Sequence, residues 1–471
     1  MPDTPHGGTP AEADLPPLPG RFWQMVGPGA VLVGLSIGAG ELIVWPRLTA
    51  KFGAVMTWAA MLGVFIQFWL NLEIGRYTLA TGQSVYAGFA RLGRAWPIVF
   101  LLLNVVSWIV PGWARTCGGA LKVLLVGPDG WGSPTAWTAI TFLGVAAVLF
   151  GPRSAYRSME ITVEVLVVVI TLGLLAIALF VADAGTWSAL AAGAVNIGYK
   201  PAEMPAYELF SAIVFAGAGG TANIFFCFYV RDKGWGMGGL VPAVVGPRRG
   251  GAEKQADVAF RIRPSEENRV RWRAWMRQMT LDQAAFFWFL NSFTILLFVV
   301  GALAVLHKQG IVPEQEMLVL QEASILESAL GATGKYLFLL VGLATLFSTQ
   351  LTLLDGVARS CADILHTGFA WARRTPTGVW YARIAIAWMV IGVGLTYLYE
   401  SIPPILFLLN AGFFGGIAMA VYAPLTLLIN LRQLPAPFRP SKLRIAIMVA
   451  ISAFYVVFAA TASVMVLQRL W

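Results

Sequence analysis

Residues 27–41 read Gly-Pro-Gly-Ala-Val-Leu-Val-Gly-Leu-Ser-Ile-Gly-Ala-Gly-Glu, and residues 215–223 read Phe-Ala-Gly-Ala-Gly-Gly-Thr-Ala-Asn. Both stretches are apolar, yet each carries several glycines near its middle. Glycine lowers helix stability by roughly 1 kcal/mol relative to alanine, so adjacent glycines favour an unwound turn. In hydrocarbon, unwound backbone is tolerated only where it lines a cavity or binds a ligand. We therefore expect two interrupted helices with a binding site between them; close helix packing through small residues is the alternative.

The composition of the whole chain indicates a membrane protein. Of its 471 residues, 58% are hydrophobic and only 12% are charged, against about a quarter charged in soluble domains. The net charge of +9 comes from basic residues that lie between apolar segments. This distribution follows from membrane topology. We expect membrane lipid as a partner and no nucleic acid.

About eleven apolar segments, each of about 20 residues, predict an all-α polytopic membrane protein. They begin near Gly27, Gly53, Trp96, Thr138, Glu160, Glu208, Leu281, Gly334, Ala382, Pro404 and Leu443. The membrane domain is expected to cover residues 21–471, with inverted repeats over about 27–182 and 207–432 and a final helix over about 443–468. Residues 1–20 are predicted to be a disordered cytoplasmic tail, and they show no signal peptide.

Arginine and lysine concentrate in the loops after the even-numbered segments, above all in a basic loop over residues 231–278. The positive-inside rule then places the protein in the inner (plasma) membrane, with its N-terminus in the cytoplasm and its C-terminus outside. In this loop, arginines alternate with Trp272 and Trp275. We interpret that stretch as a cationic helix on anionic lipid, with RNA binding by aromatic stacking as the alternative.

Glu41 directly follows the first predicted break. A carboxylate inside a membrane is costly and indicates a function, although a helix cap is the simpler interpretation. Hard cations prefer oxygen ligands. We therefore expect Glu41, beside Gly38, to bind a metal cation together with the Ala218 carbonyl, Thr221 and Asn223.

Four more ionisable residues fall within the apolar segments. Arg115, in the middle of the third segment, either neutralises an acid or binds an anionic substrate. Glu164, Asp355 and Arg359 lie toward the inner ends of their segments. An ion-pair network and ordinary interfacial anchoring both stay open for these residues.

Several short motifs resemble the Nramp family of proton-coupled divalent-metal transporters. They are Gly27-Pro-Gly29, Phe52-Gly53, residues 67–75 and Gly217-Ala218. The resemblance covers the order of roughly ten segments, with patchy identity within the motifs. It implies an inverted-repeat fold of the LeuT or amino acid–polyamine–organocation type, in which helices one and six are broken.

The resemblance also implies an altered metal site. The family's Asp-Pro-Gly-Asn motif falls on residues 38–41, where glycine replaces the aspartate and glutamate replaces the asparagine. The family's methionine ligand falls on Thr221 and its histidine on Asn223, while a third-helix glutamate falls on Arg115. Asn410 matches a polar position of the occluded site. Because a thioether helps to select softer metals, its loss predicts a harder cation, and the coupling to protons is in doubt.

The leading hypothesis is an Nramp-related secondary transporter that moves a metal cation by alternating access. The first alternative is an amino-acid or organic-anion transporter of the same fold, in which Arg115 holds the substrate carboxylate. The second is a non-transporting membrane sensor that signals through residues 231–278. We expect neither an enzyme nor a cofactor, because no nucleophile elbow and no zinc-protease motif occurs. The oligomeric state stays open.

Overall fold

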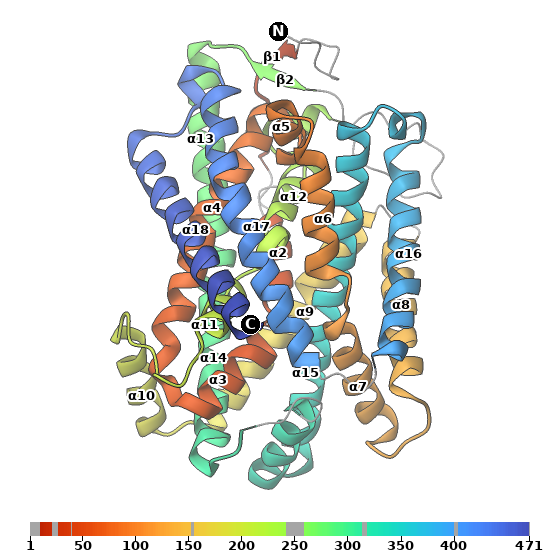
Figure 1. The fold of residues 1–471 in the computed structure, drawn as a ribbon, viewed down its shortest axis with the longest axis vertical. Helices are drawn as coiled ribbons and strands as arrows, with labels where there is room; N and C mark the ends of the chain where they lie inside the picture. The colour runs from red at the N-terminus through yellow and green to blue at the C-terminus, as the bar shows by residue number, and fades with distance from the viewer. Residues whose placement is uncertain are drawn as a thin grey trace.

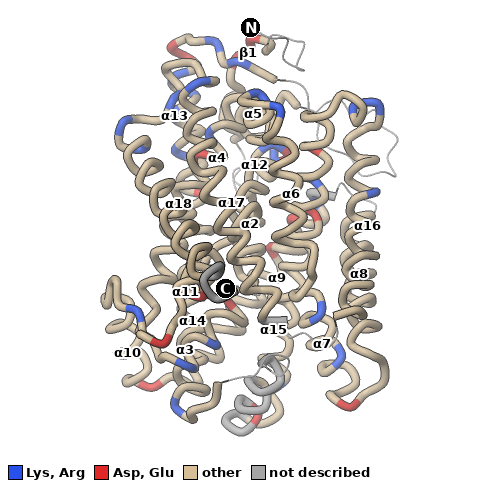
Figure 2. The backbone as a smooth tube through the Cα atoms, viewed as in Figure 1, with Lys and Arg blue, Asp and Glu red and all other residues tan. Residues whose placement is uncertain are grey.

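Long α-helices that run side by side make up most of the molecule (Figure 1). The computed structural model describes residues 10–20, 27–38, 40–151, 155–241, 259–312, 318–399 and 404–470. Charged residues gather toward the two ends of the molecule, and its middle is mainly uncharged (Figure 2). This distribution is the one that helices need in order to lie in hydrocarbon. The predicted class, an all-helical polytopic membrane protein, is confirmed.

The structure does not settle the number of membrane crossings. In its described part, eight helical stretches are long and apolar enough to cross a membrane. One of them covers residues 28–81 and has 54 residues, more than two crossings need at about 20 residues each. A further apolar helix, Pro134–Leu149, is shorter. The number eleven therefore stays a prediction.

The first half of the chain begins with a short strand and continues in helices. Its elements are β1 (Ala11–Ala13), α2 (Pro28–Ser36), the π-helical turn η1 (Gly40–Val44), α3 (Trp45–Phe52), η2 (Gly53–Met56), α4 (Thr57–Thr81), α5 (Val85–Leu92), α6 (Trp96–Trp108), α7 (Gly112–Val126), α8 (Pro134–Leu149), α9 (Ala155–Val181) and α10 (Ala184–Val195). Asp183 caps α10 and pairs with Lys308 across a 2.7 Å Nζ–Oδ2 distance. The hydrogen bond from Lys308, with further ones from Thr186, holds the pKa of the Asp183 carboxyl below its usual range.

The second half contains the other broken helix and the long C-terminal helices. Its elements are α11 (Ala206–Val214), the 3₁₀ turn η3 (Gly220–Ile224), α12 (Phe225–Asp232), η4 (Gly236–Leu240), β2 (Phe260–Ile262), α13 (Glu266–Asp282), the π-helical stretch η5 (Gln283–Leu290), α14 (Asn291–Val305), η6 (His307–Gln309), α15 (Leu318–Gly368), η7 (Ala372–Arg374), α16 (Thr377–Leu398), α17 (Pro404–Arg432), η8 (Ala436–Phe438) and α18 (Lys442–Leu470). Helix α15 is kinked at Gly331, where φ is 68°.

Both predicted helix breaks are present. In the first, α2 ends at Ser36, Ile37 has a ψ of 78°, and the chain resumes helical turns only at η1. In the second, α11 ends at Val214, and Gly219 and Gly220 have φ values of 76° and 52°. These are left-handed backbone angles, which glycine adopts without the penalty that a Cβ atom imposes. The glycines of this second break therefore have a direct conformational role.

A third interruption, between α6 and α7, was not predicted from the sequence. Helix α6 ends at Trp108, and α7 begins at Gly112 directly after Pro111. Proline has no backbone N–H and cannot continue the hydrogen-bond ladder of a helix. The Trp388 indole on α16 donates to the freed Trp108 carbonyl at 3.3 Å. Trp108, the last residue of α6 before this interruption, also belongs to the central site described below.

The predicted disorder of the N-terminal tail is wrong for residues 10–20. Strand β1 pairs in parallel with β2, and the Leu15 side chain beyond it is fully buried. The next residues lie on α13, where Arg271 donates to the Leu15 carbonyl at 2.8 Å and Trp275 donates to the Pro16 carbonyl at 2.7 Å. Residues 1–9 lie outside the described part of the chain. Side chains of α13 therefore hold the tail in place through hydrogen bonds to the tail's backbone carbonyls.

The predicted basic loop over residues 231–278 contains more regular structure than expected. Helix α12 reaches Asp232, and α13 begins at Glu266 and leads through η5 into α14; residues 242–258 are outside the description. Trp272 and Trp275 are 6% and 1% exposed. Trp272 packs on Phe438. Because both rings are buried in the protein, they face neither bases nor lipid, although arginines of the same helix stay exposed.

Candidate functional site

A small cavity lies where the two broken helices meet. Its volume of about 20 Å³ leaves room for roughly one water-sized particle. All its lining residues are buried. They are Leu35, Ser36, Gly38, Gly40, Trp108, Trp113, Phe215, Gly217, Ala218, Thr349, Leu353 and Leu408. We call this space the crossing cavity.

Glycines let the two breaks approach each other closely. A Cβ atom at Gly40 would lie 2.6 Å from the Phe215 carbonyl oxygen, closer than real Cβ atoms come to a neighbour. A Cβ atom at Gly38 would collide with the Thr349 hydroxyl of α15. Interiors are packed to near-crystalline density and cannot absorb such overlaps without displacement. The glycines of the first break are therefore required by contacts with α11 and α15 as well as by backbone shape.

Glu41 lies beside the crossing cavity but does not line it. Its side chain is fully buried, and neither carboxylate oxygen has a hydrogen-bond partner in the described structure. Its polar neighbour is Thr294 of α14, whose hydroxyl donates to the Asn291 carbonyl at 3.1 Å. A buried charge costs several kcal/mol unless it is paired or hydrogen-bonded. This carboxylate is thus poised to receive a cation or a proton.

Gln67 of α4 holds the unwound part of the second break. Its amide nitrogen donates to the Val214 carbonyl at 2.9 Å, and its amide oxygen accepts from the Gly219 N–H at 3.1 Å and from the Asn223 amide at 3.0 Å. The unwound backbone thereby regains partners that a continuous helix would have supplied. Gln67 was not among the predicted site residues, although a glutamine inside an apolar segment was a usable signal.

Asn291 of α14 supports the same break from another side. Its amide nitrogen donates to the Ala216 carbonyl at 2.8 Å, while its amide oxygen is buried and has no partner in the described part of the chain. This orphan oxygen is on the same helix as Thr294, the polar neighbour of Glu41. Asn291 was also missed from the sequence, because nothing in the spacing of α14 residues indicates which of them meets a break near residue 216.

The two predicted ligands on η3 already have partners. Trp108 donates from its indole nitrogen to the Thr221 hydroxyl at 2.8 Å. The Asn223 amide nitrogen donates to the Gln67 amide oxygen, and the Asn223 amide oxygen has no partner among the residues that the structure describes. Neither side chain lines the crossing cavity. Of the six predicted binding residues, the structure brings only Gly38 and Ala218 to the cavity.

Arg115 and Asn410 lie away from the crossing cavity. The Arg115 guanidinium donates to the Tyr399 carbonyl at the end of α16 at 3.1 Å, where a cation favourably meets the C-terminal end of a helix dipole. Asn410 is exposed on α17; the neighbouring Leu408 lines the cavity instead. Whether Arg115 neutralises an acid or binds an anionic substrate stays a prediction; it does not line the crossing cavity.

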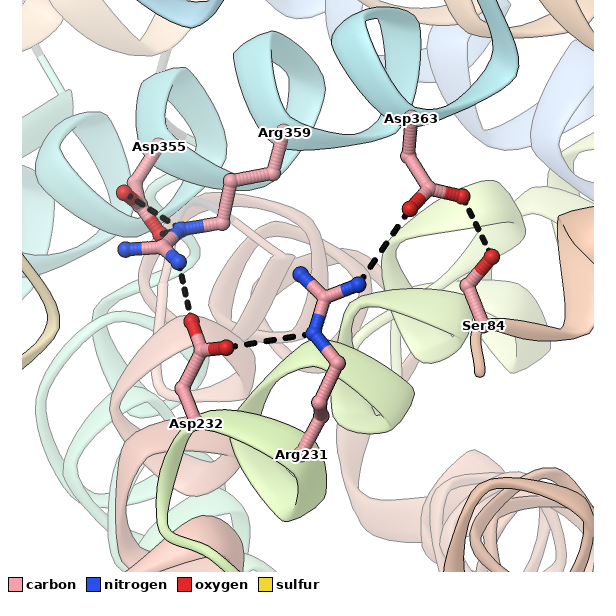
Figure 3. A network of polar contacts seen from close by, with 6 residues as sticks. All are labelled: Ser84, Arg231, Asp232, Asp355, Arg359 and Asp363. Atoms are coloured by element: carbon pink, nitrogen blue, oxygen red, sulfur yellow. Dashed lines mark hydrogen bonds and ion pairs between the residues drawn. The ribbon is translucent and has the colours of Figure 1, made fainter. Parts of the chain in front are cut away.

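Asp355 and Arg359 belong to a buried ion-pair network between α12 and α15 (Figure 3). Arg359 binds Asp355 of the same helix at 2.7 Å and also pairs with Asp232 of α12. Next to Asp232, Arg231 bridges to the Asp363 carboxylate at 3.3 Å. The described network is completed by Ser84, which caps α5 and donates to Asp363, and by Tyr381 of α16, which donates to Asp355 at 2.8 Å.

Glu164 lies in a different group of charges. It neighbours Glu160 on α9. Glu160 pairs with Arg157 at 2.6 Å and with Lys233 at 2.7 Å. Of the residues for which a network and interfacial anchoring were both open, Asp355 and Arg359 lie in one ion-pair network and Glu164 lies in a separate group of charges.

The described residues lack a conventional cluster of metal ligands. No group of three or more His, Cys, Asp or Glu side chains among them could hold a metal ion. A cation at the break would therefore be held by the Glu41 carboxylate together with neutral oxygens, which suits a hard cation that prefers oxygen ligands. The Asn291 and Asn223 amide oxygens and the freed carbonyls of the breaks are oxygens of this kind.

The helix order, the two glycine-broken helices and the cavity between them define the LeuT-type fold of secondary transporters. The chain superposes on a manganese transporter from Eremococcus coleocola, solved with an aromatic bis-isothiourea substituted compound, with a TM-score of 0.66 and 14% sequence identity. The superposition covers 98% of this chain and 91% of that chain.

Two transporters with other ligands have the same fold. MhsT in complex with L-phenylalanine matches with a TM-score of 0.53 and 11% identity, over 94% of this chain and 98% of that one. The nucleobase-cation-symport-1 family transporter Mhp1, with bromovinylhydantoin bound, matches with a TM-score of 0.52 and 15% identity, over 95% and 92%. No family model matches the sequence, and no curated protein does. At these identities the likeness establishes the fold.

Proposed function

We propose that the protein is a secondary transporter that carries a metal cation across the membrane by alternating access, with the cation bound at the first helix break. The observation that carries the proposal is the Glu41 carboxylate, which is fully buried and has no hydrogen-bond partner among the described residues. Half-helix ends and unwound carbonyls at the meeting point of two repeats are where such transporters bind their substrates. The likeness in fold to a manganese transporter supports the same class of substrate.

The size of the crossing cavity favours a small substrate. A space of about 20 Å³ accepts roughly one water-sized particle, which suits a cation without its hydration shell. In this proposal, Glu41, which directly follows the lining residue Gly40, supplies the negative charge beside the cavity, and freed carbonyl oxygens of the breaks replace water ligands. The missing thioether favours a hard cation such as Mg²⁺ or Ca²⁺ over softer metals.

Uptake into proteoliposomes tests this function. We expect Glu41→Gln to abolish uptake of Mg²⁺, Ca²⁺ or Mn²⁺, because the neutral amide cannot compensate the charge of a dehydrated cation. Glu203→Gln, which changes an exposed glutamate, is the matched control and should leave uptake unchanged. Undiminished metal uptake by folded Glu41→Gln protein would remove this carboxylate from transport.

A small organic solute is the second candidate, and the aromatic lining of the crossing cavity favours it. The lining includes the aromatic residues Trp108, Trp113 and Phe215. Aromatic rings pack well against the apolar parts of ligands. Arg115 does not line this cavity; its guanidinium donates to the Tyr399 carbonyl. Uptake of an aromatic amino acid that Trp108→Leu abolishes, with no metal flux, would favour this candidate.

The orientation in the membrane is part of the proposal. The end that carries β1, α5 and α13 is proposed to face the cytoplasm, and α10 and the turn after α14 to face outside. The arginines on α13 support this assignment through the positive-inside rule. We also propose that the chain contains two inverted repeats, over about 27–182 and 207–432, and that it lies in the inner membrane. Both proposals rest on the order of the apolar segments and the basic loops between them.

A further inference from the structure

A second, larger cavity opens at the end of the molecule that carries β1 and β2. Its volume is about 510 Å³, which falls within the range of roughly 300–1,000 Å³ typical of small-molecule sites. It lies between the last turns of α4 and α5, strand β2, and the segment after α17. The crossing cavity has a different lining and belongs to another part of the fold.

Four arginines from four different segments line this larger cavity. Arg91 comes from the last turn of α5, Arg261 from β2, Arg432 from the end of α17, and Arg439 from the residues after η8. We call them the arginine cluster. The positive-inside rule explains why loops on one side of a membrane are basic. It does not explain why four guanidiniums from distant parts of the chain share one cavity.

The arginine cluster has no counter-charge in the described structure. No Asp or Glu lines the cavity among the described residues, and none of the four arginines forms an ion pair there. In the β1–β2 pairing, the acidic residue Glu12 lies opposite Arg261 of the cluster. Their two side chains do not form an ion pair. Four like charges around one cavity repel one another, so binding an anion would relieve that repulsion.

Part of the cluster is fixed in place by neutral groups. Arg91 donates to the Tyr77 hydroxyl at 2.7 Å and to the Gln433 amide oxygen at 3.3 Å. The Nε of Arg439 donates to the Leu434 carbonyl at 2.9 Å. Neutral acceptors hold these guanidiniums without cancelling their charge, and each guanidinium has five donors in a rigid fork. Positioned forks of this kind match the oxygen geometry of phosphate groups.

We propose that the arginine cluster is a binding site for a phosphate-bearing anion, separate from the transport site. The anion is either the head group of an anionic membrane phospholipid or a soluble phosphate compound, because both present the same oxygens to the guanidiniums. The site does not depend on which substrate the protein transports. A bound anion would connect the ends of α4, α5 and α17 to strand β2.

The test uses the full-length protein in nanodiscs and two probes. In the first arm, inorganic pyrophosphate is titrated by calorimetry into protein held in pure phosphatidylcholine. In the second, the thermal unfolding temperature is compared between discs of phosphatidylcholine alone and discs of phosphatidylcholine and phosphatidylglycerol in equal parts, since a ligand of the native state stabilises it. The cavity variant is Arg261→Gln with Arg432→Gln, two side chains that line the cavity and make no hydrogen bond to another described residue. The control is Arg269→Gln with Arg273→Gln on the exposed side of α13.

We expect wild type and the control variant to respond in at least one arm, and the cavity variant to lose that response by about tenfold or more in affinity. A response to pyrophosphate identifies a soluble ligand, and a response only to phosphatidylglycerol identifies a lipid head group. If wild type responds to neither probe, the proposal is wrong. It is also wrong if the control loses as much as the cavity variant, because surface charge alone would then explain the binding. Should the double variant not fold, Arg439→Gln takes its place.

Discussion

At the scale of single residues, Gly220 shows why the second break needs glycine. Its φ is 52°, and an added Cβ atom would lie 2.6 Å from the Cα atom of Gly415 on α17. The backbone angle and the contact are independent requirements, and both exclude a side chain. Tyr422 also donates from its hydroxyl to the Gly220 carbonyl at 2.8 Å, so α17 holds the unwound turn through a polar contact as well.

We predict that Gly220→Ala lowers the thermal unfolding temperature of the purified protein. A left-handed alanine costs about 1–2 kcal/mol, and displacement of α17 would add to this cost. Gly119→Ala is the control, because a Cβ atom at Gly119 meets nothing within 4 Å and alanine favours a helix. Equal unfolding temperatures for the two variants would show that the break does not depend on Gly220.

Glycine is the kind of residue whose role a sequence can predict, because its effect on the backbone is local. The direction of the Glu41 side chain was not predictable in this way. Glu41 lies in the π-helical turn η1, where the wider spacing changes which side of the helix a residue faces compared with a regular α-helix. Gln67 was missed for a different reason. Its contacts with Val214 and Gly219 join segments about 150 residues apart, and no local pattern encodes such a contact.

At the scale of helices, the network between α12 and α15 ties the second half of a broken helix to the long helix α15 (Figure 3). Three aspartates and two arginines take part, and Arg359 contacts two of the aspartates. Removing one partner from a buried ion pair leaves an uncompensated charge, which is much more costly than losing the attraction itself. In the proposed transport cycle, rocking of α12 against α15 would have to break these contacts or carry them along.

We predict that Arg359→Met destabilises the protein by roughly 3–5 kcal/mol, because it leaves Asp232 and Asp355 buried without a cation. Arg383→Met is the matched control. Arg383 is exposed on α16 and stacks on Trp380, a contact that contributes at most about 1 kcal/mol. Chemical unfolding in mild detergent gives the comparison. If both variants lose the same stability, the network does not hold the two helices together.

The N-terminal tail illustrates what sequence cannot give at this scale. Strands β1 and β2 have three residues each, too few for an alternating pattern, and their pairing joins residues near 12 to residues near 261. The prediction of disorder for residues 1–20 rested only on their proline-rich composition. The apolar segments, by contrast, were predictable, because a helix in hydrocarbon must be long and uncharged whatever its neighbours are.

At the scale of the whole molecule, the orientation in the membrane can be tested with cysteine labelling. Arg273 on α13 and Glu203 in the segment after α10 are both exposed, and the helices α13 and α10 lie toward opposite ends of the molecule (Figure 1). The native cysteines Cys117, Cys227 and Cys361 are buried, so background labelling is expected to be low. In intact cells, a membrane-impermeant maleimide should label Glu203→Cys and not Arg273→Cys. The reverse pattern would invert the proposed topology.

The central claim is that a cation binds to the protein through Glu41 at the first helix break, and calorimetric titration of metal ions into the purified protein tests it most directly. We predict that wild type binds at least one of Mg²⁺, Ca²⁺ and Mn²⁺, and that Glu41→Gln weakens this binding by at least about tenfold while the protein stays folded. Glu203→Gln should bind as wild type does. Metal binding of wild-type strength by the Glu41→Gln variant, or no metal binding by wild type, would contradict the claim.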